Sequence, residues 1–371
     1  MNLTLCLTHD CQLDCEYCYA GPKIPKKMSM ETARGAIDLG LAETLALAEN
    51  NPLQEKKMQL GFFGGEPLLE WETLKAATEY CEKKAADSKI EILKTLTTNA
   101  INLDEKKIEY LKKHRFHLGL SIDGDPTTHD SLRKFKNGNP SHSAAAKTLK
   151  HFQGPDAGAE VVFVLDPKNI VRVAKGVEWF IEQNIAEISL NPNYEAEWTE
   201  KHRGIWRKQY DILAEIYVDA LRELNPLTIN VIDGKIRTHV NEGYKECDKC
   251  GFGNAEIAVA AGGNIYPCER IVADDSNIEL LIGTVETGLD RDKIAAITAR
   301  RRDVPKKCLS CEYRARCAHW CSCVNYQTTG TVNEVADIVC FHEKLAIETA
   351  DRAAEILACE DNPLFIAKFY A

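Results

Sequence analysis

Three cysteines near the start of the chain have the types and spacing to bind a metal cluster. Cys11, Cys15 and Cys18 form the pattern CxxxCxxC, with Tyr17 directly before the last of them. Iron-sulfur clusters use thiolate ligands, and a cubane 4Fe-4S cluster needs four ligands, so three local thiolates leave one iron open. A zinc site is the alternative. Structural zinc also takes four ligands, and His9 is the nearby candidate for the fourth.

The chain has 371 residues and 15 cysteines, and a second group of these cysteines lies in its last third. Eight of them form two complete sets of four, and four of the eight have the spacing CxxCx5Cx3C. Zinc or iron-sulfur clusters could both fill such sets. The eight cysteines are Cys247, Cys250, Cys268, Cys308, Cys311, Cys317, Cys321 and Cys340.

Composition and charge exclude several classes of function. No signal segment precedes Cys11, and no run approaches the roughly 18 apolar residues of a membrane span, so we predict a cytoplasmic protein with no membrane partner. In a reducing compartment this cysteine density indicates metal binding rather than disulfides. The net charge of −10 argues against nucleic-acid binding, which needs a basic face.

The first 225 residues alternate short apolar runs with amphipathic stretches, a pattern typical of repeated strand–helix units. Strands are predicted at residues 3–8, 58–63, 91–97, 117–122, 160–165 and 187–191. Helices are predicted at residues 30–48, 70–84, 104–113, 143–151, 171–183 and 207–224. Six such units predict an α/β fold with a partial (β/α)6 TIM barrel, in which ligands collect at the carboxyl ends of the strands.

Polar and glycine-rich segments follow the predicted strands at those ends. The cysteine loop follows the first strand, and three further segments follow the next three strands. These segments are Gly64-Gly65-Glu66-Pro67, Thr97-Thr98-Asn99 and Ser121-Ile122-Asp123-Gly124. Any one of them would be an ordinary turn, but their order after CxxxCxxC makes the set specific, and we expect the four strand ends to face one cavity.

The cysteine loop and the glycine-rich segment that follows the second strand resemble the radical S-adenosylmethionine (SAM) superfamily over roughly residues 1–225. The resemblance implies that the three cysteines bind a 4Fe-4S cluster whose open iron takes the amino and carboxylate groups of SAM. It also implies reductive cleavage of SAM to methionine and a 5'-deoxyadenosyl radical. The three cysteines are then catalytic as well as metal-binding.

The same resemblance implies roles for individual residues around SAM. Glu66 supplies a negative charge for the methionine ammonium beside open backbone carbonyls, and the planar fork of Arg133 suits the SAM carboxylate. Polar residues after the fourth strand face the ribose. The predicted SAM contacts are Tyr17, Gly64, Gly65, Glu66, Pro67, Asn99, Ser121, Asp123, Arg133 and Leu190.

The later cysteines resemble the SPASM extension of radical SAM peptide-modifying enzymes, with Gly263 five residues before Cys268. An alternating segment over residues 255–267 predicts a β-hairpin around Gly262-Gly263-Asn264. The resemblance implies two auxiliary 4Fe-4S clusters, and Cys323 is a possible competitor for one ligand. The implied sets are Cys247, Cys250, Cys268 and Cys321 for the first and Cys308, Cys311, Cys317 and Cys340 for the second. Cys247 either completes the first set or leaves it open.

The SPASM resemblance implies a peptide substrate whose side chain loses a hydrogen atom, which gives a thioether or carbon–carbon cross-link in a ribosomally made precursor. One alternative is oxidation of Cys or Ser to formylglycine, as in the anaerobic sulfatase-maturating enzymes. Those enzymes place an aspartate as general base where this chain has Glu269, which could still accept a proton. Another alternative is a non-catalytic iron-sulfur electron-transfer protein.

The predicted domains are the barrel at residues 1–225, the SPASM domain at 226–345, and a C-terminal helix and tail at 346–371, with the helix itself over residues 342–357. Ten residues before Cys11 and 31 after Cys340 leave too little room for a leader-binding domain in this chain. Leader recognition is therefore expected to use the barrel surface or a separate partner protein. A flavodoxin or ferredoxin is the expected electron donor.

Overall fold

The structure is a computed structural model that describes residues 1–50, 55–155 and 157–370. The chain forms two compact units by internal packing. The first contains residues 1–14, 18–119 and 250–302, and the second contains residues 15–17, 120–249 and 303–371, in each case as far as they are described. Each unit is defined by the packing of its residues against one another. The predicted functional domain boundaries at 225 and 345 therefore stay a prediction.

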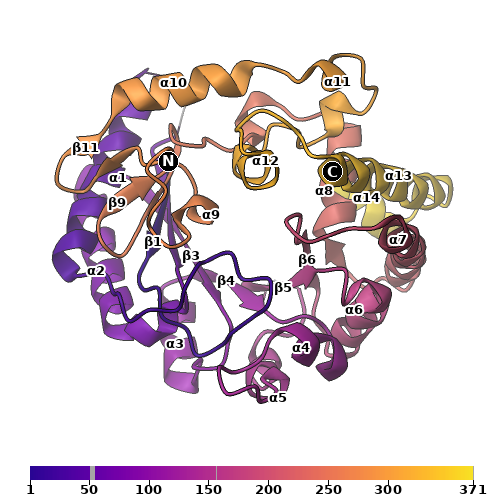
Figure 1. The fold of residues 1–371 in the computed structure, drawn as a ribbon. Coiled ribbons are helices and arrows are strands. Elements are labelled where there is room, and N and C mark those ends of the chain that lie inside the picture. Colours follow the sequence, from indigo (N-terminus) through magenta and orange to yellow (C-terminus); the bar gives the residue numbers. More distant parts are fainter. Residues whose placement is uncertain (51–54, 156, 371) are drawn as a thin grey trace. The chain divides into compact units, whose positions relative to one another are not determined.

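The first unit is built on a mixed sheet whose strand order is β11-β10-β9-β8-β1-β2-β3. The parallel strands β1, β2 and β3 are followed in the chain by α1, α2 and α3, and α1 and α2 lie along the outer side of these strands (Figure 1). The strands are β1 Asn2–Cys6, β2 Lys57–Phe63, β3 Glu91–Thr98, β8 Glu256–Val259, β9 Asn264–Tyr266, β10 Gly283–Thr284 and β11 Gly288–Leu289. The helices are α1 Met30–Asn50, α2 Trp71–Ser88, α3 Glu105–Lys113, α9 Glu269–Val272 and α10 Arg291–Arg302.

The hairpin predicted over residues 255–267 is confirmed, since β8 and β9 pair antiparallel and Gly263 has a φ of 93° in the turn. The hairpin also does something that the sequence did not predict. Its first strand pairs in parallel with β1, with Leu3 opposite Ile257, so it extends the sheet of the first unit. The segment that carries Cys250 and Cys268 is therefore attached to a β-strand of the predicted barrel region.

The second unit holds the parallel strands β5, β6 and β7 with helices around them. The side chains of β5 alternate between buried and half-buried, as expected for a strand whose two faces differ. The strands are β5 Ala159–Leu165, β6 Glu187–Pro192 and β7 Thr228–Ile229, while β4 Phe116–Ser121 is divided between the units. The helices are α4 Pro126–Leu132, α5 His142–Ala146, α6 Val173–Glu182, α7 Glu200–Arg222, α8 Asn230–Val240, α11 Lys306–Leu309, α12 Ser322–Thr329, α13 Asp337–Cys359 and α14 Pro363–Phe369.

The predicted α/β fold is confirmed, and all six predicted strands are present among the described residues. The helix predicted over 143–151 is wrong in detail, because it is split into α5 and a 3₁₀ turn, Leu149–His151. Thr148 donates its hydroxyl to the Ala145 carbonyl at 2.8 Å, a side-chain bond that competes with helix continuation. The C-terminal helix α13 begins at Asp337, five residues before the predicted start, so it carries Cys340.

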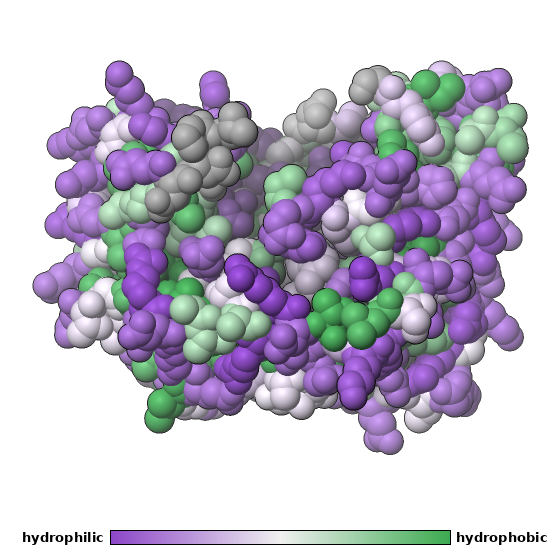
Figure 2. Space-filling view, turned by 90° about the horizontal axis from the view of Figure 1, so that it is seen from above, coloured by the Kyte–Doolittle hydropathy of each residue, from purple (hydrophilic) through white to green (hydrophobic). Residues whose placement is uncertain are grey.

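The face shown in Figure 2 is mostly hydrophilic, and apolar residues form small patches on it. Within the part of the chain that the structure describes, no helix is long and apolar enough to span a membrane.

Candidate active site

The glycine-rich segment after β2 lies directly against the backbone that leads to Cys11. Gly65 N–H donates to the Thr8 carbonyl at 2.7 Å, and Glu66 N–H donates to the Asp10 carbonyl at 2.8 Å. A Cβ on Gly65 would lie 2.1 Å from the Asp10 oxygen. Gly64 has a φ of +130°, a backbone conformation that residues with a Cβ rarely adopt. Glycine is therefore required at both positions for this close approach.

Glu66 is buried, at 1% exposure, and its carboxylate joins the ends of two strands. It accepts hydrogen bonds from the Thr98 hydroxyl at 2.7 Å, the Asn99 N–H at 2.8 Å and the Leu68 N–H at 3.0 Å. Burial raises the pKa of Glu66, and these bonds oppose that effect. The structure thus gives Glu66 a positioning role that the sequence did not predict, while its contact with SAM stays a prediction. Pro67 begins the short 3₁₀ helix, Pro67–Glu70, that follows.

The thiols of the cysteine loop that belong to the first unit both have hydrogen-bond donors. Asn99 Nδ2 lies 3.6 Å from Cys11 Sγ, and the Leu13 N–H lies 3.4 Å from the same sulfur. Cys11 is buried, and burial raises the pKa of its thiol. Cys18 is exposed and has Lys23 Nζ at 2.8 Å. Donors of this kind tune the potential of a cluster bound through the sulfur.

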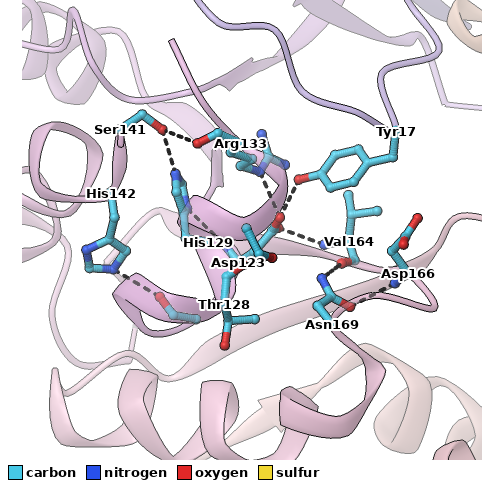
Figure 3. A network of polar contacts seen from close by, with 12 residues as sticks. Tyr17, Asp123, Thr128, His129, Arg133, Ser141, His142, Val164, Asp166 and Asn169 are labelled. Atoms are coloured by element: carbon cyan, nitrogen blue, oxygen red, sulfur yellow. Dashed lines mark hydrogen bonds and ion pairs between the residues drawn. The ribbon is translucent and has the colours of Figure 1, made fainter. Parts of the chain in front are cut away.

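Asp123 is the centre of a polar network in the second unit (Figure 3). Its carboxylate accepts hydrogen bonds from the Tyr17 hydroxyl, from Arg133 Nε at 3.1 Å and from the Val164 N–H at 2.9 Å. The Arg133 guanidinium also lies over the Tyr17 ring, with 5.1 Å from Cζ to the ring centroid. Burial raises the pKa of Asp123, an effect that Arg133 opposes. Asp123 therefore positions Tyr17, which stands between Cys15 and Cys18 in the chain.

Two residues that the sequence prediction missed complete this network. His129 Nδ1 accepts from the Asp123 N–H at 3.2 Å, and its Nε2 lies 3.0 Å from the Ser141 hydroxyl. The Ser141 hydroxyl donates to the Arg133 carbonyl at 2.8 Å. His129 must be neutral to accept through Nδ1. No sequence motif marks His129 or Ser141, because their role depends on how the chain folds back after β4.

Acidification should destabilise the protein through His129. Burial and the nearby Arg133 lower its pKa from 6.5 to about 2, so below pH 6.5 the unfolded chain binds a proton that the folded chain does not. Between pH 7.5 and 5.5 this costs about 1.4 kcal/mol of unfolding free energy. We expect His129→Gln to lose that part of the pH dependence in denaturant titrations at the two pH values. The exposed control His117→Gln should keep it, and an unchanged pH dependence in His129→Gln would contradict the assignment.

The remaining predicted SAM contacts lie in β4 and β6. Ser121 is the last residue of β4 and is half-buried. Leu190 is buried in β6, and both of its backbone groups bond to Asn230, which begins α8: the Leu190 N–H donates to Asn230 Oδ1 at 2.8 Å, and Asn230 Nδ2 donates to the Leu190 carbonyl at 3.3 Å. Asn230 therefore holds the backbone of β6 at Leu190.

In the first unit, two carboxylates lie beside Cys268, one from β8 of the hairpin and one from the start of α9. Oxygen atoms of Glu256 and Glu269 and the Cys268 sulfur lie within 4.8 Å of one another. Burial and the neighbouring Glu269 raise the pKa of Glu256 to about 7. Cys250 is the other member of this predicted set in the first unit. Arg301 Nη2 donates to the Cys250 carbonyl at 3.0 Å and so holds this segment. The two other members of this predicted set, Cys247 and Cys321, belong to the second unit, so the assembly of the set stays a prediction.

The second predicted auxiliary set lies entirely within the second unit. Its four cysteines line one cavity of about 230 Å³. Burial raises the pKa of the Cys317 thiol, the Glu343 carboxylate adds to this effect, and Lys235 opposes it. The four cysteines of the set are Cys308, Cys311, Cys317 and Cys340. A cavity with four thiols fits the soft-donor requirement of an iron-sulfur or zinc site.

Cys323, the predicted competitor for Cys321, lies close to it, with 3.6 Å between the two sulfurs. Cys323 is buried and Cys321 is partly exposed. The two thiols are therefore direct neighbours, and the choice of ligand between them stays a prediction.

Comparison with proteins of known sequence agrees with this arrangement. The chain is 30% identical over 190 residues to an uncharacterized protein of Methanocaldococcus jannaschii, and the match spans 51% of this chain and 62% of that relative. It is 24% identical over 332 residues to a cysteine-type anaerobic sulfatase-maturating enzyme of Clostridium perfringens, which covers 84% of this chain and 85% of the relative. It is 22% identical over 340 residues to the radical SAM cyclopropyl synthase TigE of Paramaledivibacter caminithermalis, at 86% and 67% coverage.

The fold is also similar to a solved structure of native anSMEcpe with bound AdoMet and the Cp18Cys peptide. The TM-score is 0.75 at 19% identity, over 96% of this chain and 98% of that one. The predicted relationship to the sulfatase-maturating enzymes is thus confirmed. The model of the radical SAM superfamily matches residues 5–196, which include the cysteine loop and every predicted SAM contact, and this chain therefore belongs to the radical SAM superfamily.

Proposed function

We propose that this protein is a radical SAM enzyme that abstracts a hydrogen atom from a side chain of a peptide and so introduces a thioether or carbon–carbon cross-link into a ribosomally made precursor. The observation that carries the proposal is the glycine-rich segment, whose backbone bonds to Thr8 and Asp10 hold it against the residues directly before Cys11. An electron-transfer protein has no need of such a segment beside its cysteines.

The residues present fit SAM and a 4Fe-4S cluster. Cys11, Cys15 and Cys18 would bind three irons, and the sulfur of Cys11 already receives hydrogen bonds from Asn99 and Leu13. The chemistry that SAM and the cluster supply when bound is reductive formation of a 5'-deoxyadenosyl radical. The chain's part is to fix the ligands and to orient the substrate.

The peptide substrate is supported by the relatives. The similar structure contains a bound peptide, and the relative TigE is named a cyclopropyl synthase. The two auxiliary cysteine sets would hold 4Fe-4S clusters that accept an electron from the substrate radical or ligate the substrate. A flavodoxin or ferredoxin would supply the reducing electron.

Oxidation of Cys or Ser to formylglycine is the second candidate function. It is favoured by the carboxylates of Glu256 and Glu269 beside Cys268, because either could accept the proton that this oxidation releases. The match to the sulfatase-maturating enzyme over 85% of its length also favours it. A cysteine-containing sulfatase peptide that gains an aldehyde on incubation with the enzyme would replace the cross-linking proposal with this one.

The experiment that tests the proposed function is reconstitution of the full chain with iron and sulfide under anaerobic conditions, followed by incubation with SAM and dithionite. We expect 5'-deoxyadenosine and methionine in equal amounts. Zinc in place of iron, or iron without 5'-deoxyadenosine, would identify a binding or electron-transfer protein instead.

Loss of the second auxiliary set should separate SAM cleavage from product formation. We expect Cys317→Ala to keep at least half of the 5'-deoxyadenosine yield while the modified peptide falls more than about 100-fold, because the substrate radical then lacks its electron acceptor. Liquid chromatography with mass detection measures both products in one sample. Undiminished peptide product in Cys317→Ala would contradict an electron-accepting role for this set.

A further inference from the structure

A buried ion pair joins two helices of the second unit beside Cys317. Lys235 on α8 and Glu343 on α13 have 2.7 Å between Nζ and Oε2, and their side chains are 7% and 9% exposed. Glu343 follows Cys340 by three residues on α13, which places both on one side of the helix. A buried ion pair is costly to form, so its position next to two of the cavity cysteines calls for a specific explanation.

Each member of the pair holds one of the two peptide groups that flank Cys317. Lys235 Nζ donates to the Arg316 carbonyl at 3.1 Å, and the Ala318 N–H donates to Glu343 Oε2 at 2.6 Å. The backbone before and after Cys317 is therefore attached to a cation on one helix and an anion on the other. Hydrogen bonds to charged groups are stronger than those between neutral groups, so these two bonds hold the backbone around Cys317 firmly.

The neighbouring groups support the same segment. Arg316 makes a bidentate ion pair with Asp351, at 2.8 and 2.6 Å, and donates to the Lys235 carbonyl at 3.0 Å. His319 Nδ1 lies 3.0 Å from the Cys317 carbonyl. Lys235 Nζ also lies 3.3 Å from the Tyr244 hydroxyl. The loop of Cys317 is thus held from both of its ends.

We propose that Lys235 and Glu343 are positioning residues that fix Cys317 beside Cys340 and set the reduction potential of the cluster bound by Cys308, Cys311, Cys317 and Cys340. This inference rests on the proposed function, in which these four cysteines bind a 4Fe-4S cluster. A negative charge near a cluster disfavours its reduction and a positive charge favours it, and in a buried site one unit charge has a large effect. The paired charges nearly cancel in the native protein, so removing one of them unmasks the other.

Glu343→Gln is the primary variant, because glutamine keeps an acceptor for Lys235 and for the Ala318 N–H but removes the negative charge. We expect a more positive reduction potential, with at least a tenfold higher ratio of reduced to oxidised cluster at a fixed potential, which corresponds to about 59 mV. Lys235→Met should shift the potential in the opposite direction. The measurement is a redox titration of the full chain followed by electron paramagnetic resonance, with Cys11, Cys15 and Cys18 replaced by alanine to remove the first cluster.

Asp233→Asn is the matched control. Asp233 is also a buried acid on α8 with an ion-pair partner, Lys368, but its other partners, Tyr217 and Ile229, lie outside the Cys317 loop. It should destabilise the protein without moving the potential. A variant in which Cys308, Cys311 and Cys340 are all replaced by alanine leaves too few thiolates to hold this cluster, so it identifies the signal that belongs to the cluster and should lower the iron content by about four per chain.

The outcomes separate the two claims. If replacing Cys308, Cys311 and Cys340 together leaves the iron content unchanged, the cluster is absent, and the proposed auxiliary site and this inference both fail. If that triple variant loses iron but Glu343→Gln leaves the potential unchanged, or Asp233→Asn shifts it equally, the cluster stands and the positioning role of Lys235 and Glu343 is wrong.

Discussion

Replacing Cys11, Cys15 and Cys18 together by alanine is expected to abolish 5'-deoxyadenosine formation and to lower the iron content from about twelve to about eight per chain. These three thiols would hold the one cluster with an open iron, and no other residue in the loop has comparable affinity for iron. The two auxiliary sets do not depend on the loop, so their eight irons should remain. The measurement is iron, sulfide and 5'-deoxyadenosine on wild type and variant, reconstituted side by side under anaerobic conditions.

Cys81→Ala is a suitable control for this experiment. Cys81 is buried in α2, and no cluster role is assigned to it, so its replacement should leave both iron and 5'-deoxyadenosine unchanged. An unchanged iron content in the triple variant would show that the loop binds no cluster. A variant that still forms 5'-deoxyadenosine would place the radical chemistry at another cysteine set.

Much of the fold could be predicted because its signals are local. The alternation of β5 and the apolar face of α7 repeat with the periods of a strand and a helix, and the Gly262-Gly263 turn marks the hairpin. Local signals were also missed. Thr199 caps α7 and Asn362 caps α14 just before Pro363, and both are recognisable helix starts. The pairing of β8 with β1 could not be predicted, because it joins residues that are more than 250 positions apart.

The candidate site shows the same division. Cysteines and the glycine-rich segment could be predicted from spacing, since their chemistry depends on residue type. The hydrogen bonds that hold the cysteines and the glycine-rich segment in place could not be predicted. Glu66 was predicted to contact the methionine ammonium of SAM, and this stays a prediction; the structure shows that its carboxylate accepts hydrogen bonds from Thr98 and Asn99. Residues such as His129, Asn230 and Glu343 belong to no motif, because each acts through a backbone group that only the folded chain brings within reach.

Gly65→Ala is expected to destabilise the protein by roughly 3 kcal/mol and to impair loading of the first cluster. The new Cβ would lie 2.1 Å from the Asp10 oxygen, 2.7 Å from the Asp10 carbonyl carbon and 2.8 Å from the His9 oxygen. All three are backbone atoms, so no side chain can rotate away, and the segment before Cys11 must move. Overpacking of this kind costs about 1–3 kcal/mol or more. The bonds from Gly65 and Glu66 to that segment would be strained as well.

Gly204→Ala separates this clash from the general effect of a glycine substitution. Gly204 lies in α7, and a Cβ there would meet no atom within 4 Å. Alanine at this position should stabilise the protein by about 0.5–1 kcal/mol, because glycine is the poorer helix former. Thermal unfolding and iron content of the two variants, each against wild type, measure both effects. Gly65→Ala should lose up to about four irons per chain, whereas Gly204→Ala should lose none. If Gly65→Ala kept full iron and stability, the close approach of the glycine-rich segment to the cysteine loop would not be what positions Cys11.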